Sequence, residues 1–203
     1  MAEITAKMVM SLRAKTDAPM MDCKKALNEA DGDATRAEEI LRVRFGNKAS
    51  KASSRVAAEG IVSCYVDSNG KNGALVEVNS ETDFCAKNDE FKSFVETLTK
   101  ASVENDIDDV ETLSKHSING KTVEELRTQL IGKIGENITL RRVKRISAKG
   151  NLFSYNHGGR VGVIVDIKST DENLGKDIAM HIAATKPKAL DQNGVSQDLI
   201  DAE

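Results

Sequence analysis

The sequence predicts an α+β fold, in which an N-terminal bundle of three helices precedes a core of two duplicated strand–strand–helix subdomains. Two observations support this prediction. Apolar residues recur at helical spacing over residues 1–46, and after Gly60 the pattern changes to the β-branched alternation that is typical of strands. The second pattern then returns from Gly150 onward, which indicates an internal duplication.

The N-terminal region contains three short amphipathic segments. Ile4, Met8 and Leu12 lie on one face of the first segment, and the second segment is stopped by Gly32. The third segment is expected to end at Gly46. Helices this short bury little apolar area, so the region is more typical of a docking module than of an enzyme. The small and basic residues that follow suit either a solvated helix face or a linker.

The duplicated unit begins with a predicted hairpin. Residues 61–70 and 73–83 flank a Gly- and Asn-rich turn, and a helix is expected to begin near Asp89. Residues 150–187 repeat strand, Gly-rich turn, strand and amphipathic helix. Each copy has too little apolar surface to be stable alone, so we expect the two copies to pack together.

The segment between the copies predicts one more helix and one more strand. Thr122 and Glu125 have the spacing of a capping box at a helix start. Residues 137–146 then alternate apolar and basic side chains, which suits a strand with its apolar side partly inward.

Composition limits the classes of function. The chain has 203 residues, a net charge of −3, 30% charged and 39% hydrophobic residues. This balance argues against a dedicated nucleic-acid binder. The charged N-terminus excludes a secretory signal, and no apolar run approaches the roughly 20 residues that span a bilayer. Three cysteines without a CxxC pair favour a reducing compartment, which predicts a cytoplasmic protein; an organelle matrix would have the same signature.

The sequence contains no recognisable catalytic site. Its three histidines lack metal-ligand spacing, and no phosphate-binding loop motif occurs. We therefore expect no enzyme activity, no metal, no cofactor and no small-molecule substrate. His157 lies in a turn beside two glycines, where it serves either the turn itself or a function.

The polar link after the second predicted strand carries an unexpected aromatic residue. Phe84 follows Asp83 at the tip of this link. Such a ring either folds back as a hydrophobic staple or is an exposed anchor for a protein partner. The basic run 141–145 either contacts phosphates or is the solvated side of a strand.

Five motifs, in order, resemble the bacterial elongation factor Ts family, the nucleotide exchange factors of the GTPase elongation factor Tu. They are LRAKTDAPMMDCKKALNEADGD, VEVNSETDFCAKNDEF, KIGENITLRRV, SYNHGGRVGVIV and DIAMHIAATKP. The resemblance implies a first domain like ubiquitin-associated (UBA) modules. It divides the chain into that domain at 1–47, a linker and first core subdomain at 48–147, and a second subdomain at 148–203.

The resemblance also implies which residues bind the partner. Thr82, Asp83, Phe84 and Cys85 match the turn that the family inserts beside the magnesium site of elongation factor Tu, with Phe84 as the wedge. Three residues of the N-terminal region and one of the second copy are implied as further contacts: Arg13, Met20, Met21 and His157.

Three departures from the family pattern affect these expectations. Asp17 stands where the family usually has Gly, and Cys85 replaces a usual Val. The chain is also expected to end before the family's C-terminal part, which leaves a homodimer of the full-length form open. Besides an exchange factor, an adaptor without exchange activity and an RNA-associated protein remain as alternatives.

Overall fold

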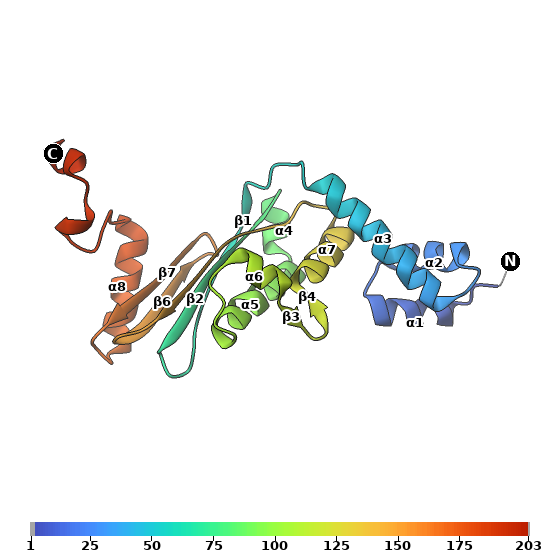
Figure 1. Ribbon diagram of the computed structural model, residues 1–203, viewed down its shortest axis with the longest axis horizontal. Helices are drawn as coiled ribbons and strands as arrows, with labels where there is room; N and C mark the ends of the chain where they lie inside the picture. The colour runs from blue at the N-terminus through green and yellow to red at the C-terminus, as the bar shows by residue number, and fades with distance from the viewer. Residues whose placement is uncertain (1–2, 203) are drawn as a thin grey trace.

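A three-helix bundle forms one end of the protein in the computed structural model, which describes residues 3–202 (Figure 1). Its helices are α1 (Ala6–Thr16), α2 (Met20–Glu29) and α3 (Ala34–Ala52). They enclose a small apolar core of their own, made of Val9, Leu12, Ala18, Cys23, Ala26, Leu27, Ala30, Ala37, Leu41 and Phe45. The predicted bundle is therefore confirmed.

The helix ends of the bundle follow from local chemistry. The side chain of Asp33 accepts a hydrogen bond from the backbone N–H of Arg36 at 3.0 Å and so caps α3, as the sequence predicts. Asp17 ends α1 with φ of 56°, a left-handed conformation that Asp tolerates better than most residues. The turn thus keeps its shape without a glycine.

The expected end of the third helix at Gly46 is wrong, because α3 continues to Ala52 and passes the expected boundary at residue 47. Ala49 and Ala52 are buried against the core, so tertiary packing outweighs the weak helix propensity of glycine. At Gly132 the facing helix comes so close that an added Cβ would lie 2.3 Å from the ring of Phe45.

A three-stranded antiparallel sheet forms the centre of the molecule. Its strands are β1 (Glu59–Val66), β2 (Asn72–Ser80) and β5 (Thr139–Ser147), in the order β1-β2-β5. The accompanying elements are α5 (Asp89–Glu104), α6 (Val110–Lys115), β3 (Ser117–Ile118), β4 (Lys121–Thr122) and α7 (Val123–Ile134). The hairpin, the helix start at Asp89 and the capping box of Thr122 with Glu125 are confirmed.

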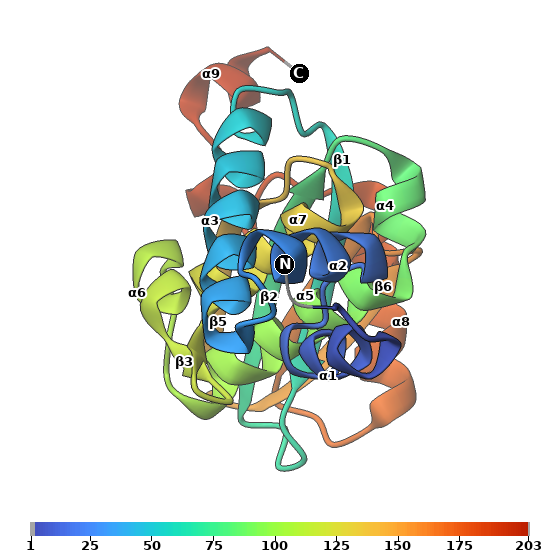
Figure 2. The ribbon, with the colours of Figure 1, turned by 90° about the vertical axis from the view of Figure 1, so that its right-hand side faces the viewer.

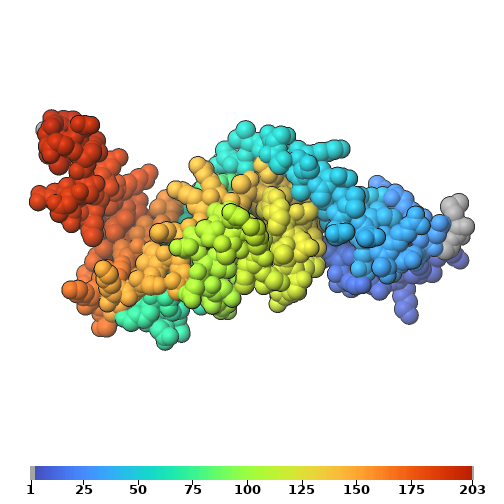
Figure 3. Space-filling view, in the orientation of Figure 1, coloured from blue at the N-terminus to red at the C-terminus, as the bar shows by residue number. Residues whose placement is uncertain are grey.

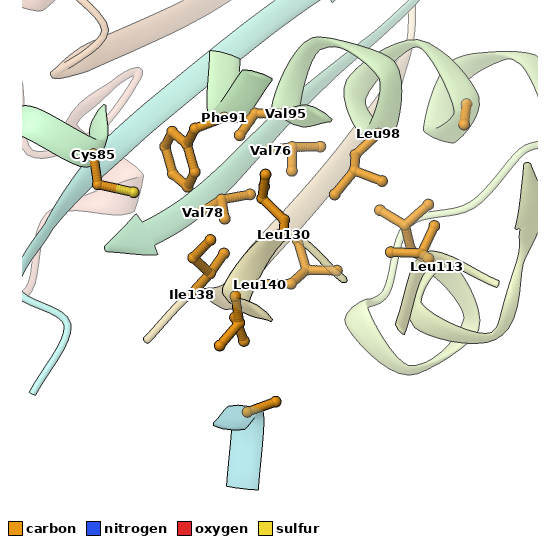
Figure 4. Close-up of a cluster of buried hydrophobic side chains, with 14 of the residues drawn as sticks. Val76, Val78, Cys85, Phe91, Val95, Leu98, Leu113, Leu130, Ile138 and Leu140 are labelled. Atoms are coloured by element: carbon orange, nitrogen blue, oxygen red, sulfur yellow. The ribbon is translucent and has the colours of Figure 1, made fainter. Parts of the chain in front are cut away.

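The core of this central part lies between the sheet and its helices (Figure 4). Val76 and Val78 of β2 face the side chains of α5, of which Phe91, Val95 and Leu98 are fully buried. Side chains of α7 and the start of β5 complete the cluster, among them Leu130, Ile131, Ile138 and Leu140. The alternation in residues 137–146 therefore marks a strand whose apolar side faces inward.

The second copy of the repeat forms the other end of the molecule. It consists of β6 (Asn151–His157), β7 (Val161–Ile167) and α8 (Glu172–Thr185), with the two strands antiparallel and α8 packed on them. Gly175 lets α8 approach closely, since a Cβ there would lie 2.2 Å from the ring of Phe153. Strand, turn, strand and helix occur in both copies, so the predicted duplication is confirmed.

The three parts lie in a row and give the molecule an elongated shape (Figure 3). Beyond α8 the chain forms a 3-10 turn η1 (Gln192–Gly194) and a short helix α9 (Gln197–Asp201). Within residues 3–202, no helix is long and apolar enough to cross a membrane.

Candidate partner-binding site

The link between β2 and α5, expected to be a polar turn, contains a short helix, α4 (Asp83–Lys87). This helix begins where the hydroxyl of Thr82 accepts a hydrogen bond from the backbone N–H of Cys85 at 3.3 Å. Phe84 lies in its first turn with 80% of its surface exposed. The staple interpretation of Phe84 is therefore wrong, since the ring does not fold back into its own chain.

The two residues after Phe84 anchor α4 to the core. Cys85 and Ala86 are 3% and 7% exposed, and Figure 4 shows the Cys85 side chain pointing toward the cluster around Phe91 and Val78. Burial, reinforced by the negative charge of Glu136, raises the pKa of the Cys85 thiol to about 11. The thiol is thus protonated at neutral pH, and its side chain packs inward.

Asp83 carries a negative charge beside the exposed ring. Its carboxylate accepts a hydrogen bond from Lys87 Nζ at 2.7 Å, one helical turn later. This bond is the main cause that lowers the pKa of Asp83 below its ordinary value. The exposed end of α4 thus presents an apolar ring flanked by an ionised carboxylate and an ammonium group.

His157 lies at the end of β6, in the turn that leads to β7. Its Nδ1 lies 2.9 Å from the hydroxyl of Tyr155. The turn needs two residues in the left-handed region, and Gly158 and Gly159 supply them with φ of 58° and 73°. The carbonyl of Gly159 accepts a hydrogen bond from the backbone N–H of Val62 at 2.7 Å, which fixes the turn against β1.

The His157 turn and α4 border the same groove. This open groove, of about 410 Å³, is lined on one side by Asp83, Ala86 and Lys87, and on the other by the residues flanking His157, which include Asn156 and Arg160. The structure therefore brings together two segments that lie about 70 positions apart in the sequence. The two segments come from different copies of the repeat.

Arg13, Met20 and Met21 lie elsewhere, on the N-terminal bundle. Arg13 is exposed in the last turn of α1, and Met20 and Met21 are 48% and 62% exposed at the start of α2. The bundle occupies one end of the molecule and α4 its middle (Figure 1), so in the view from the N-terminal end the bundle lies in front of the rest of the molecule (Figure 2). These three exposed residues of the bundle, here called the second surface, do not line the groove.

The basic strand residues form ion pairs within the chain. Arg141 and Arg142 contact the carboxylate of Glu77 at 3.5 and 2.6 Å, and Arg145 pairs with Asp106. This is the pattern of a solvated strand face whose charges are compensated locally. It weakens the interpretation of this run as a phosphate-binding surface.

Glu136, which no sequence pattern pointed to, holds the segment just before α4 with its carboxylate. The only available signal was its place in the motif KIGENITLRRV, which gave no hint that this loop contacts Thr82. Among residues 3–202, no group of three or more His, Cys, Asp or Glu side chains is arranged to hold a metal ion.

Comparison with known proteins gives a consistent result. The family model described as Elongation factor TS matches residues 81–203. Over its full length the chain is 64% identical to elongation factor Ts of Methylobacillus flagellatus, of which it covers 70%. It is likewise 59% identical to elongation factor Ts of an Azoarcus species and 58% identical to that of Thiobacillus denitrificans, and covers 69% and 70% of those proteins.

Proposed function

The chain belongs to the elongation factor Ts family of translation elongation factors, and from this premise we propose that it binds elongation factor Tu·GDP and promotes release of GDP. Phe84 carries this proposal. Its ring is 80% exposed on a helix whose next two residues are buried, so an apolar anchor is held outside a rigid core.

We assign the residues of α4 different parts in this function. Phe84 inserts into the partner beside its magnesium and phosphate site, and Asp83 accompanies it as the polar neighbour. Thr82 and Cys85 hold α4 in place, because the hydroxyl of one caps the helix and the thiol of the other is buried. Arg13, Met20, Met21 and His157 make further contacts with the GTPase.

Energetics require such a spread interface. A GTPase that binds its nucleotide with nanomolar affinity holds it with about 12 kcal/mol. To shift a partner from a mostly closed to a mostly open state, the factor must bind the open state roughly 10⁴-fold more tightly than the closed one. This difference corresponds to about 5.5 kcal/mol. One buried Phe contributes about 2–3 kcal/mol. The remainder must come from other contacts, which fits a protein with exposed residues on the bundle, α4 and the His157 turn.

Exchange of this kind needs no bond-making group. If the factor weakens nucleotide binding by a given ratio, the nucleotide weakens factor binding by the same ratio. Displacing the magnesium ion removes charge neutralisation from the phosphates and so weakens the hold on the nucleotide. We therefore infer that the protein is not an enzyme in the chemical sense and acts in the cytoplasm, where bacterial translation elongation takes place.

A stopped-flow measurement of fluorescent GDP release from elongation factor Tu tests the proposal. We expect the rate to rise with protein concentration and to saturate. Binding without acceleration would instead identify an adaptor. Binding to RNA that falls steeply with salt, without any effect on GDP release, would identify an RNA-associated protein.

A further inference from the structure

A single carboxylate holds the segment that leads into α4. Glu136, in the loop between α7 and β5, accepts hydrogen bonds from the backbone N–H groups of Glu81 and Thr82 at 3.1 and 3.0 Å. Its second oxygen accepts the hydroxyl proton of Thr82 at 2.6 Å. These N–H groups lie between the last residue of β2 and the first turn of α4, where neither element offers them a partner.

The contact is reciprocal. The carboxylate of Glu81 accepts a hydrogen bond from the backbone N–H of Asn137 and lies 3.1 Å from a guanidinium nitrogen of Arg55. The side-chain amide of Asn137, which is 4% exposed, donates to the carbonyl of Arg55 at 2.7 Å. Two adjacent loops are therefore tied together by two carboxylates, each of which binds the backbone of the other loop.

The bond from Thr82 to Glu136 also decides how α4 begins. A hydroxyl has one proton, and here that proton points to Glu136. The oxygen lone pairs are then free to accept the N–H of Cys85, which is the N-cap bond of α4. Phe84 lies between Thr82 and Cys85 in sequence, so the direction of its ring depends on this pair of bonds.

We propose that Glu136 is a positioning residue for Phe84: its carboxylate fixes the start of α4 and so aims the exposed ring at the partner. This inference rests on the proposed function. A charged acceptor with three donors makes strong, directional bonds. A ring held in its binding orientation loses less conformational freedom on association, which leaves more of its contact energy for opening the partner.

The test uses Glu136→Gln, which keeps the size of the side chain but replaces one acceptor oxygen by a donor. Glu77→Gln is the matched control, because Glu77 is likewise a partly buried glutamate of the central part whose carboxylate binds another segment, and its partners Arg141 and Arg142 lie on β5 rather than at α4. The first readout is alkylation of individual cysteines, resolved by mass spectrometry and followed over pH, so that the rate is compared per thiolate; this separates accessibility from the pKa of Cys85, which the charge of Glu136 raises. We expect Cys85 to react roughly tenfold faster in Glu136→Gln, the factor that 1.4 kcal/mol of lost protection produces, while Cys23 and Cys64 keep their rates.

The second readout is stimulated GDP release, measured for Glu136→Gln alone and combined with Phe84→Ala. We expect Glu136→Gln to slow release roughly tenfold when Phe84 is present and less than about twofold when it is absent, because the carboxylate acts through the ring. A similar slowing in both backgrounds would overturn the inference, and so would an unchanged rate of Cys85 alkylation. Should Glu136→Gln fail to fold, Thr82→Val is tested in the same way; it removes the hydroxyl bond to Glu136 together with the N-cap bond of α4 and keeps the two backbone bonds to Glu136.

The two proposals fail in different ways. If Phe84→Ala alone leaves stimulated release unchanged, the proposed function fails and the role of Glu136 in it fails too. If Phe84→Ala slows release but Glu136→Gln behaves like Glu77→Gln, only the inference about Glu136 is refuted.

Discussion

Replacing Phe84 by alanine separates function from stability. The ring is 80% exposed, so its removal is expected to change the free energy of unfolding by no more than about 0.5 kcal/mol, as for other surface positions. In the proposed complex the same ring is buried, and its loss is expected to remove about 2–3 kcal/mol of apolar transfer energy. The concentration-dependent rate of stimulated GDP release should then fall about 30- to 140-fold, since each 1.4 kcal/mol is a factor of ten.

The assay is stopped-flow release of fluorescent GDP from elongation factor Tu, with thermal melting of each variant as the measure of folding. Leu190→Ala is a suitable control, because Leu190 is fully exposed in the C-terminal segment, away from α4. It should neither melt differently nor change the release rate. A Phe84→Ala variant that melts like the parent and still stimulates release like the parent would refute the reasoning.

Three further predictions concern the surroundings of α4. Phe91→Ala removes a ring that is 0% exposed and should lower the unfolding free energy by about 3–5 kcal/mol, or the melting temperature by roughly 6–20 °C; an unchanged melting curve would place the ring outside the core. Cys85, whose pKa is about 11, should resist alkylation at pH 8 in the native protein and react once the chain is unfolded, and a native rate equal to that of a free cysteine would contradict its burial. Lys87→Met should raise the pKa of Asp83 toward its ordinary value, as measured by an NMR titration of the carboxyl carbon. Because the folded pKa of Asp83 is the lower one, the stabilisation from this pair is present above the unfolded pKa and disappears as the pH falls through the folded pKa; equal titrations of both proteins would show that the pair does not form in solution.

Local patterns were sufficient for much of the fold. Helical spacing and caps predicted the bundle, and the repeated change from alternation to amphipathic periodicity predicted both strand–strand–helix units. The end of α3 was predicted wrongly, and the pairing of β5 with β2 was not predicted at all, for the same reason. Both depend on contacts between distant segments, such as that of Phe45 with Gly132, and no local pattern contains them.

The sequence likewise predicted one part of the candidate site and not the other. An aromatic residue in a polar link was sufficient to select Phe84, but spacing alone left both the staple and the exposed anchor open. Only the fold distinguishes them, because α4 turns Cys85 inward and Phe84 outward. The role of Glu136 could not be predicted from the sequence, because its partners lie 54 and 55 positions away. A glutamate in a polar loop has no local pattern that indicates such a contact.

The structure joins the bundle and the core rigidly, which suits the proposal that both surfaces contact one partner. The bundle is joined to the core by the unbroken helix α3, whose Phe45 lies against α7. Lys133 of α7 adds ion pairs of 2.7 Å to Asp17 in the bundle and 2.5 Å to Glu90 on α5. The side chain of Asp17 is 81% exposed, so its ion pair with Lys133 contributes at most about 1 kcal/mol. The packing of α3 on α7 is therefore the main contact that holds the bundle against the core. Because both surfaces are held at a set distance before binding, the second contact needs little further ordering, and more of the binding energy remains to open the nucleotide site.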